Sequence, residues 1–381
     1  MNPGVRRLLP WLPLALALVW SAVVLATGVT TQSWQPGYDL SVYRHGAEDL
    51  LAGRDLYERV TDRGHYFVYP PLAAVLFVPL LLLPTAGPGA VGVDLVVWDV
   101  LLVVALVLGG GRLLRGAGVP ARLVPTALAL VVVSDPFREA LVLGQVSPLV
   151  VLALVGGVVL AARSPWGGAV LAGLAGAVKV TPALVVALGV HRRWRRFALL
   201  TVGVGLVLTL LGALASPPAW SAYFGGLLWD SSRVAAPGTT SNNSLAGGFA
   251  HLGVPDGAAT ALGAVGTLVL LVWFLRRAGS VGAFEAGLAV SLLTCLGSPV
   301  TWSHHALAAP LAAVWWLSTR EVRDGSRGAV VLAAVVLLVW ILPVLQWGSV
   351  LGGTAGGVLA ATRPLSVVFL VLLCGGRSVR R

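Results

Sequence analysis

Charged residues and cysteine are both scarce in this chain of 381 residues. Only 11% of the residues are charged and 57% are hydrophobic, whereas a typical soluble domain is about one quarter charged. The two cysteines, Cys295 and Cys374, both lie in apolar runs, which excludes a disulfide framework and a thiolate metal site. The composition therefore predicts a polytopic membrane protein.

The sequence signatures of nucleotide and metal chemistry are missing as well. The chain contains no P-loop, no G-x-G-x-x-G that enters a helix after a strand, and no H-E-x-x-H zinc motif. The polar loops contain no D-x-D pair that could hold a metal ion and a diphosphate. We therefore expect no metal site, no cofactor and no nucleotide-sugar donor.

The net charge of +11 comes from short basic clusters between apolar runs. Nucleic-acid binding needs one basic surface stripe instead, so we expect membrane lipids and no nucleic acid among the partners. By the positive-inside rule, such clusters mark the cytoplasmic face and place both termini inside. The clusters are Arg6-Arg7, residues 191–196, Arg276-Arg277, residues 320–327 and the tail 377–381.

A helix crosses the hydrocarbon core with about 20 apolar residues, and counting such runs gives about twelve spans. We expect an all-α protein that forms a single transmembrane domain over residues 1–381. One loop does not fit, because Arg112, Arg115 and Arg122 would lie outside. The adjacent run 123–136 is short and contains Pro125, which predicts a broken or re-entrant element. The number of spans stays open in this region.

Three polar segments are expected on the outer face: the loops 28–69 and 216–256, and the turn 298–305. The first loop carries six of the fifteen carboxylates: Asp39, Glu48, Asp49, Asp55, Glu58 and Asp62. We expect the two loops to form an active-site face on the extracytoplasmic side of the plasma membrane.

The first loop also contains an apolar pattern with helical spacing. This pattern predicts an amphipathic helix on the membrane surface, and Gly53 stands where its C-terminal cap belongs. The apolar positions are Leu40, Tyr43, Ala47, Leu50 and Leu51.

Asp39 and a histidine pair are the candidate catalytic residues. Asp39 directly follows the first span, where a carboxylate is suited to act as a general base toward an acceptor hydroxyl. Aspartate is also a preferred N-cap, so Asp39 has the alternative role of capping the helix that starts at Leu40. His304 and His305 open a late span. Adjacent residues on a helix point about 100° apart, so at most one of them should face the same cavity as Asp39.

Lys179 is the only lysine and lies within the apolar run 166–190. A buried cation at that depth needs a partner or a ligand. The partner would be Asp94 or Asp99, and the ligand would be a phosphate at headgroup level. Arg138 and Arg44 are further candidates for binding a phosphate.

Amides and aromatic rings in the outer segments could contact sugars. The amides are Gln145, Asn242 and Asn243, although asparagine in a glycine-rich loop also serves ordinary turns. The rings are Tyr43, Tyr57, Tyr69 and Trp302, although an interfacial aromatic belt explains most such rings.

The order of these motifs resembles glycosyltransferase family 87, a family of polyprenol-phosphate-dependent mannosyltransferases of the GT-C superfamily. The resemblance covers nearly the whole chain, with one departure: Asn-Asn-Ser-Leu stands where the family pattern has Asn-Gln-Ser-Leu. The motifs are Tyr38-Asp39-Leu40-Ser41-Val42-Tyr43, Gly53-Arg54-Asp55-Leu56-Tyr57, Tyr69-Pro70-Pro71, Gly144-Gln145, Lys179-Val180-Thr181-Pro182, Asn242-Asn243-Ser244-Leu245, Ser298-Pro299 and His304-His305.

The resemblance implies a GT-C-like fold and an inverting enzyme that takes mannose from polyprenyl-phosphate-mannose. The acceptor would be a lipid-linked glycan of the phosphatidylinositol mannoside or lipomannan type, and the product an α-1,2 linkage. It also implies that Asp39 is the catalytic base and that His304 or His305 is its partner. The same family includes polyprenyl-phospho-arabinose-dependent arabinofuranosyltransferases, so the sugar stays open.

A lipid or sugar transporter is the alternative from another functional class. Transporter folds show internal repeats and broken helices in both halves. Here the carboxylates concentrate in one outer loop and only one broken segment is evident, which favours the enzyme.

Overall fold

The computed structural model describes residues 9–27, 36–61, 64–86, 91–230, 233–324 and 327–376. Within these ranges the regular elements are all helical, and the only β pairing is an isolated bridge between Val60 and Tyr66. The predicted all-α class is confirmed. The basic pair Arg6-Arg7, the tail 377–381 and residues 28–35 of the first outer loop lie outside the described residues.

The described helices, with short 3-10 and π segments marked η, follow one another along the whole chain. In order they are η1 (Leu9–Trp11), α2 (Leu12–Thr27), α3 (Tyr38–Leu51), α4 (Pro71–Phe77), η2 (Val78–Leu82), α5 (Val93–Ala105), η3 (Leu106–Gly110), α6 (Gly111–Gly116), α7 (Val124–Val132), α8 (Asp135–Leu143), α9 (Ser147–Ala161), α10 (Pro165–Val178), η4 (Thr181–Val190), α11 (Arg192–Ala215), α12 (Pro217–Gly225), η5 (Leu227–Trp229), α13 (Leu245–His251), α14 (Asp256–Leu275), α15 (Ala283–Gly297), η7 (Ser303–Ala306), α16 (Ala308–Asp324), α17 (Arg327–Ile341), α18 (Val344–Leu351) and α19 (Gly353–Gly375).

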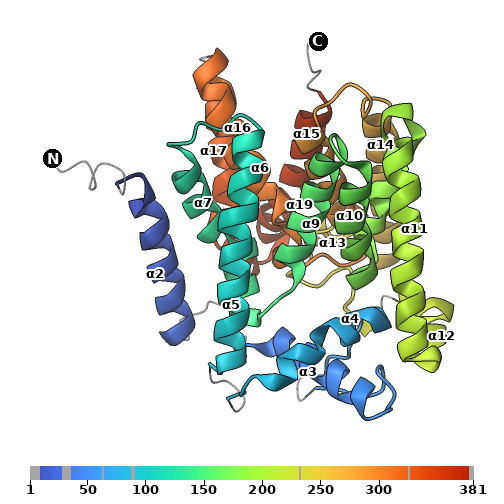
Figure 1. Ribbon diagram of the computed structural model, residues 1–381. Coiled ribbons are helices and arrows are strands. Elements are labelled where there is room, and N and C mark those ends of the chain that lie inside the picture. Colours follow the sequence, from blue (N-terminus) through green and yellow to red (C-terminus); the bar gives the residue numbers. More distant parts are fainter. Residues whose placement is uncertain are drawn as a thin grey trace.

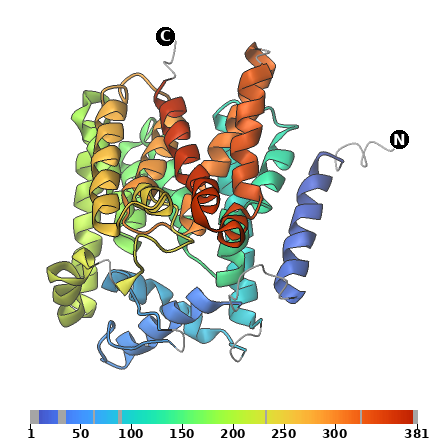
Figure 2. The same ribbon diagram turned by 180° about the vertical axis from the view of Figure 1, so that it is seen from behind.

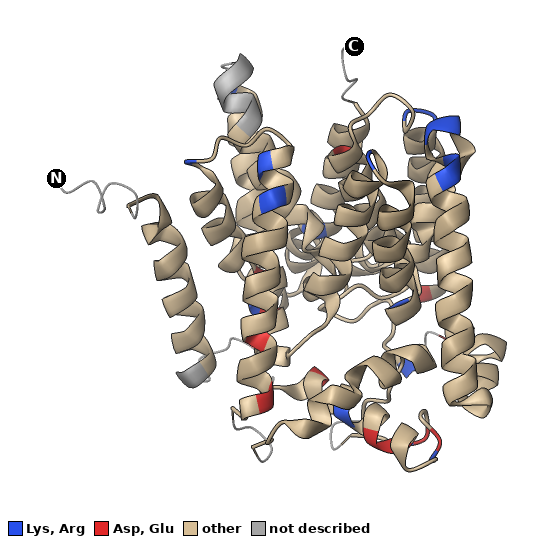
Figure 3. Cartoon of the chain, viewed as in Figure 1, with Lys and Arg blue, Asp and Glu red and all other residues tan. Residues whose placement is uncertain are grey.

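The molecule is a bundle of upright helices with a layer of short helices across one end (Figures 1 and 2). This layer contains α3, α4 and α12, and we call this end the α3 face. Basic residues gather mainly at the opposite face (Figure 3). There the first turn of α11 meets the end of α14 and the start of α15, because His191 bonds to the carbonyl of Leu275 and Arg193 to that of Val281.

Four of the described helical stretches have the length and hydropathy of membrane spans. They are Val93–Gly116, Arg192–Ala215, Asp256–Leu275 and Gly353–Gly375. A fifth forms if α17 and α18, which are bent by 73° at their junction, count as one span. The chain is therefore a membrane protein, and the count of about twelve spans stays a prediction.

Residues 70–86 form one of the apolar runs included in the count of about twelve spans, but they do not form a helix long enough to cross. Only seven residues form α4 before the chain tightens into η2 at Pro79, which is too short a helix to cross. These helices lie across the α3 face (Figure 1), where Arg44 bonds to the carbonyls of Leu80 and Leu83. The next span, Val93–Gly116, therefore runs from the α3 face to the opposite face.

With this direction of the span, the basic loop after α6 no longer lies on the outer face. Arg112 lines a surface hollow together with Arg163 and Glu285, and Glu285 lies in the first turn of α15. The start of α15 adjoins the basic turn of α11. Arg112 consequently lies on the same face as the other basic clusters, as the positive-inside rule requires.

The run 166–190 forms a hairpin instead of one continuous span. Helix α10 ends at Val178, Lys179 is extended, and η4 returns in 3-10 geometry with Pro182 in its first turn. Both outer ends of the hairpin lie at the basic face, where Arg163 adjoins Glu285 and His191 bonds to Leu275. The hairpin therefore places Lys179 at its tip, deep within the bundle.

The break predicted for the run 123–136 is confirmed. Helix α7 ends at Val132 and α8 begins at Asp135, with Pro136 in its first turn. Gly144 ends α8 with a φ of +69°, and a Cβ atom there would lie 2.7 Å from Cβ of Leu40. Only glycine combines this backbone with so close an approach to α3.

Candidate active site

Helix α3 brings Asp39 to the underside of the bundle. Gly37 is the N-cap with a φ of +72°, and its N–H donates to the carbonyl of Val142 at 2.8 Å. Asp39 lies inside the first turn and forms no capping bond, so its alternative role as an N-cap is wrong. Leu40 and Tyr43 are buried as predicted.

The other end of α3 agrees with its predicted boundary. Gly53, with a φ of +65°, follows the C-cap, which confirms the predicted stop. Leu51 is 66% exposed and does not belong to the buried stripe. That the helix rests on a membrane surface stays a prediction.

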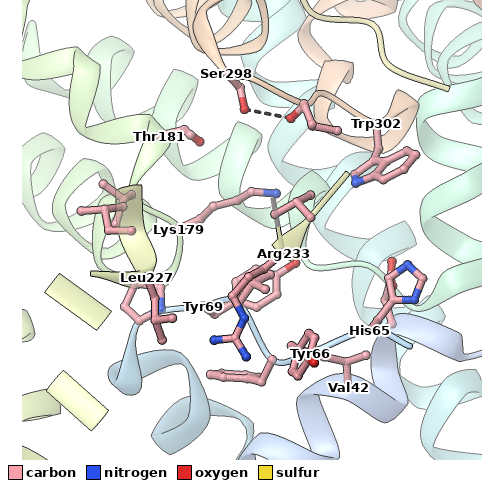
Figure 4. A pocket seen from close by; sticks show the side chains of 18 of the residues that line it. Val42, His65, Tyr66, Tyr69, Lys179, Thr181, Leu227, Arg233, Ser298 and Trp302 are labelled. Carbon is pink, nitrogen blue, oxygen red and sulfur yellow. Dashed lines mark hydrogen bonds between the residues drawn. The ribbon is translucent and has the colours of Figure 1, made fainter. Parts of the chain in front are cut away.

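Asp39 opens into a cavity of about 260 Å³ between the α3 face and the bundle (Figure 4). The cavity is built from elements far apart in sequence: the first loop, the start of α9, the tip of the hairpin, the second loop and the turn before α16. Predicted site residues that line it are Asp39, Tyr43, Tyr57, Tyr69, Gln145, Lys179, Trp302, His304 and His305.

Gln145 orients the carboxylate of Asp39. Its Nε2 donates to Oδ2 of Asp39 at 2.8 Å, while its Oε1 accepts from the hydroxyls of Tyr43 and Ser147. The two acceptor contacts fix which end of the amide faces Asp39. The Gln145 bond uses Oδ2, so the other carboxylate oxygen, Oδ1, is the candidate to accept from an incoming hydroxyl.

Burial sets the acidity of Asp39. Desolvation raises the pKa of this carboxyl, and the charge of Glu139 acts in the same direction. The charge of His304 and the Gln145 hydrogen bond lower the pKa in part. A carboxylate with a raised pKa is a stronger base, as proton abstraction from a hydroxyl needs. Burial also raises the pKa of Tyr43 well above its ordinary value, so its hydroxyl remains a donor.

Lys179 faces the cavity without a counter-ion among the described residues. Its Nζ lies 2.6 Å from Nε2 of His305 and 3.4 Å from Oγ of Ser147. The predicted ion pair with an aspartate is wrong, because Asp94 pairs with Arg44 at 3.6 Å and both carboxylate oxygens of Asp99 lack a described partner. An uncompensated buried ammonium favours an anionic ligand.

Both histidines line the cavity, against the expectation that only one would. They lie in the four-residue 3-10 segment η7, and their rings meet edge to face with centroids 4.5 Å apart. His305 contacts Lys179, whereas the charge of His304 acts on Asp39. The two rings therefore have different neighbours within one cavity.

Four predicted site residues do not line the cavity. Arg44 holds η2 and Asp94, and Arg138 pairs with Asp135, so neither is placed to bind a phosphate there. Asn242 and Asn243 are buried and donate to carbonyls of the turn after α15. They shape the cavity wall instead of contacting its contents.

Three further residues belong to the site or its support. Arg233 lines the cavity, stacks on the ring of Tyr66 with its Cζ 4.2 Å from the centroid, and donates to the carbonyl of Tyr57. It is the only arginine or lysine between residues 216 and 256, a signal that could have identified it. Glu139 contacts His304, and the fully buried Arg363 joins α19 to α8.

Comparisons with known proteins identify the family of the chain. A family model described as glycosyltransferase family 87 matches residues 67–299. A Mycobacterium tuberculosis protein named polyprenol-phosphate-mannose-dependent alpha-(1-2)-phosphatidylinositol mannoside mannosyltransferase is 32% identical over 330 residues, covering 79% of this chain and 75% of its own length. Its namesake from Mycolicibacterium smegmatis is 30% identical over 375 residues, with 86% and 82% covered.

A second Mycolicibacterium smegmatis protein, named as the corresponding phosphatidylinositol pentamannoside mannosyltransferase, is 33% identical over 288 residues and covers 70% of this chain and 66% of itself. No solved structure matches the chain significantly. The family model covers more than half of the sequence, and relatives above 30% identity extend over most of it. The chain therefore belongs to glycosyltransferase family 87.

Proposed function

We propose that this chain transfers mannose from polyprenyl-phosphate-mannose to a lipid-anchored acceptor of the phosphatidylinositol mannoside type, with inversion and an α-1,2 linkage. One observation carries the proposal: a carboxylate oriented by Gln145 and an ammonium without a counter-ion face the same cavity. The names of the relatives support the donor, the acceptor and the linkage.

The reaction needs one base and one site for the leaving group. The acceptor hydroxyl gives its proton to Oδ1 of Asp39 while its oxygen bonds to C1 of the mannose. The bond from C1 to the phosphate oxygen breaks on the opposite face of the sugar, and the electron pair leaves with the polyprenyl phosphate. Lys179, with His305 and Ser147 beside it, stabilises the charge of that phosphate.

The cavity suits the reacting ends of two lipid-linked substrates. Its volume of about 260 Å³ is below the roughly 300–1,000 Å³ of clefts that enclose whole ligands. Tyr57 and Tyr69 line the cavity and supply aromatic rings for a sugar. Arg233 and Trp302 line it as well (Figure 4). The remainder of both substrates extends out of the cavity.

The site belongs on the extracytoplasmic side of the plasma membrane. The basic clusters lie at the face opposite α3 (Figure 3), and loops rich in arginine and lysine stay in the cytoplasm. A lipid-linked sugar donor outside the cell avoids the need for a nucleotide sugar there.

Incorporation of radiolabelled mannose tests the proposal. Membranes that contain the wild-type chain should transfer mannose from polyprenyl-phosphate-mannose to phosphatidylinositol mannosides, and Asp39→Asn should lower the rate at least about a hundredfold. Glu58→Gln, an exposed acid of the same loop, is the matched control and should retain the wild-type rate.

Equal incorporation by wild type and Asp39→Asn contradicts the assignment of the base. Transfer from polyprenyl-phospho-arabinose but not from the mannose donor would make the chain an arabinofuranosyltransferase instead. Movement of labelled lipid across the membrane without any glycan product would favour a transporter.

A further inference from the structure

Helix α8 presents two carboxylates, one turn apart, to the segment that carries the histidines. Asp135 binds Arg363 at 2.7 Å, and Arg363 donates to Oγ of Ser303 at 2.8 Å. Glu139 accepts the backbone N–H of His304 at 2.9 Å. Asp135 therefore reaches η7 only through Arg363, which bonds to Ser303. Glu139 contacts η7 directly.

Glu139 also contacts the imidazole ring of His304. Its Oε2 lies 3.3 Å from Nδ1, and the side chains of His304 and Glu139 are only 4% and 10% exposed. Among the described residues, neither ring nitrogen of His304 has a hydrogen-bond partner. The charge contact with Glu139 is therefore what orients the ring.

His304 is linked to two carboxylates. Its ring contacts Glu139, and it lines the same cavity as Asp39. Of the neighbouring charges that act on Asp39, that of His304 has the largest effect and favours the ionised base. Glu139 acts on Asp39 directly in the opposite direction, by a smaller amount. In a site this buried, both effects are weakly screened.

We propose that Glu139 is a positioning residue: it holds the His304 ring at the cavity that Asp39 also lines, where the charge of His304 favours the ionised form of the base. This inference rests on the proposed function of Asp39. It gives the two histidines separate tasks, because His304 serves the base while His305 contacts the lysine of the leaving-group side.

Several titratable groups among the described residues interact electrostatically with Asp39. They are His304, Glu139, His65, Lys179, Tyr69 and Tyr43. Replacing Glu139 removes one negative charge near Asp39 and releases His304. The first change alone lowers the pKa of Asp39, and the second raises it.

Because these two effects move the pKa of Asp39 in opposite directions, the pH profile of mannose transfer distinguishes between them. If Glu139 acts through His304, Glu139→Gln shifts the acid limb of kcat/KM for mannose transfer to higher pH. If Glu139 acts only by its own charge, the limb shifts to lower pH, and a purely structural role lowers the rate equally at every pH. Glu285→Gln, the same chemical change at the far basic face, should leave the limb in place.

The double variant isolates the path. In a His304→Asn background, Glu139→Gln should no longer shift the acid limb of kcat/KM to higher pH, because the ring that Glu139 positions is absent. Glu139→Asp keeps the charge one methylene farther away and should shift the limb upward by less than Glu139→Gln. If Glu139→Gln does not accumulate in membranes, the acid limb is measured with Glu139→Asp instead.

An acid limb that stays in place or moves down in Glu139→Gln and Glu139→Asp overturns the inference. So does an upward shift that persists unchanged without His304. Both results require an active wild type, so they are distinct from failure of the proposed function, in which the wild type transfers no mannose.

Discussion

At the scale of single residues, the site depends on how Asp39 is held and charged. Gln145 occupies one carboxylate oxygen and is itself fixed by Tyr43 and Ser147. Burial raises the pKa of the carboxyl. The orientation of the Asp39 carboxylate therefore depends on Gln145, whereas its basicity depends mainly on burial. The two properties can be tested separately.

The pH dependence of transfer should follow Asp39. Below its pKa the carboxyl is protonated and cannot accept the proton of the acceptor, so kcat/KM should fall tenfold per pH unit. Because burial raises this pKa, the fall should begin at higher pH than for an ordinary aspartate. A rate profile from pH 4 to 8 with proteoliposomes measures it. A profile that is flat down to about pH 4, the ordinary range of aspartate, contradicts this prediction.

Replacing Gln145 by leucine should lower kcat with little effect on the amount of folded protein. The variant loses the donor to Asp39 and leaves the Tyr43 hydroxyl without its acceptor. We expect a loss of about tenfold to a hundredfold, the usual effect of a misplaced reacting group. Gln145→Glu separates the roles, because it keeps the size and adds a repelling charge that should move the acid limb upward. Wild-type kcat in Gln145→Leu would contradict the orienting role.

At the scale of elements, two short breaks build the site: the glycine turn after α8 and the hairpin tip after α10. Gly144 lets α8 approach α3 closely enough for Gln145 to reach Asp39. Lys179 leaves helical geometry so that its side chain enters the cavity. Both breaks lie where a regular membrane helix would otherwise continue.

Gly144→Ala should destabilise the protein. The position has a φ of +69°, and the new Cβ would lie 2.7 Å from Cβ of Leu40. The backbone strain alone costs about 1–2 kcal/mol, so thermal unfolding in detergent should occur at lower temperature. Gly203→Ala, in α11 with nothing within 4 Å of the added methyl, is the control and should be neutral or stabilising. Equal unfolding temperatures for both variants would contradict the close packing of α8 on α3.

Arg363→Met should destabilise more strongly than either glycine change. The guanidinium is fully buried, binds Asp135 and Ser303, and lies over the ring of Trp340. Removing one partner of a buried ion pair costs roughly 3–5 kcal/mol when the other charge is left buried and uncompensated. Asp135 keeps its contact with Arg138, so we expect a loss near the lower end of this range. Arg115→Met, an exposed change, should leave the unfolding temperature unaltered. A small effect of Arg363→Met would mean that Arg138 alone compensates the charge of Asp135.

Local patterns predicted α3 well, because its apolar spacing and its terminal Gly53 are properties of neighbouring residues. The hairpin 166–190 was not predictable in the same way, because a spanning helix and a hairpin within the membrane have the same apolar composition. Within this run, Lys179 and Pro182 were the sequence features that indicated a turn. The side-chain partners of Arg44 and Arg138 depend on tertiary contacts with η2 and within α8, which no local pattern reveals.

At the scale of the whole molecule, the chain has a basic face and an α3 face that carries the site (Figures 1 and 3). Residues 70–86 form no helix long enough to cross and residues 166–190 form a hairpin, so the described basic clusters between α6 and α15 lie at one face. The positive-inside rule predicts that this face is cytoplasmic.

Cysteine labelling of intact cells tests this sidedness. Leu51→Cys on α3 should react with a membrane-impermeant maleimide, because Leu51 is exposed at the α3 face. Arg163→Cys, exposed at the opposite face, should react only after the cells are permeabilised. The native Cys295 and Cys374 are buried and give no background. The reverse labelling pattern would place the site in the cytoplasm.

The central claim is that Asp39 performs the chemistry while Lys179 binds the donor within one cavity. The direct measurement is donor binding and single-turnover transfer by purified wild type, Asp39→Asn and Lys179→Met in proteoliposomes with radiolabelled polyprenyl-phosphate-mannose. We predict that Asp39→Asn binds the donor with near wild-type affinity and transfers at least about a hundredfold more slowly, whereas Lys179→Met loses donor affinity. Transfer at the wild-type rate by Asp39→Asn would contradict the account.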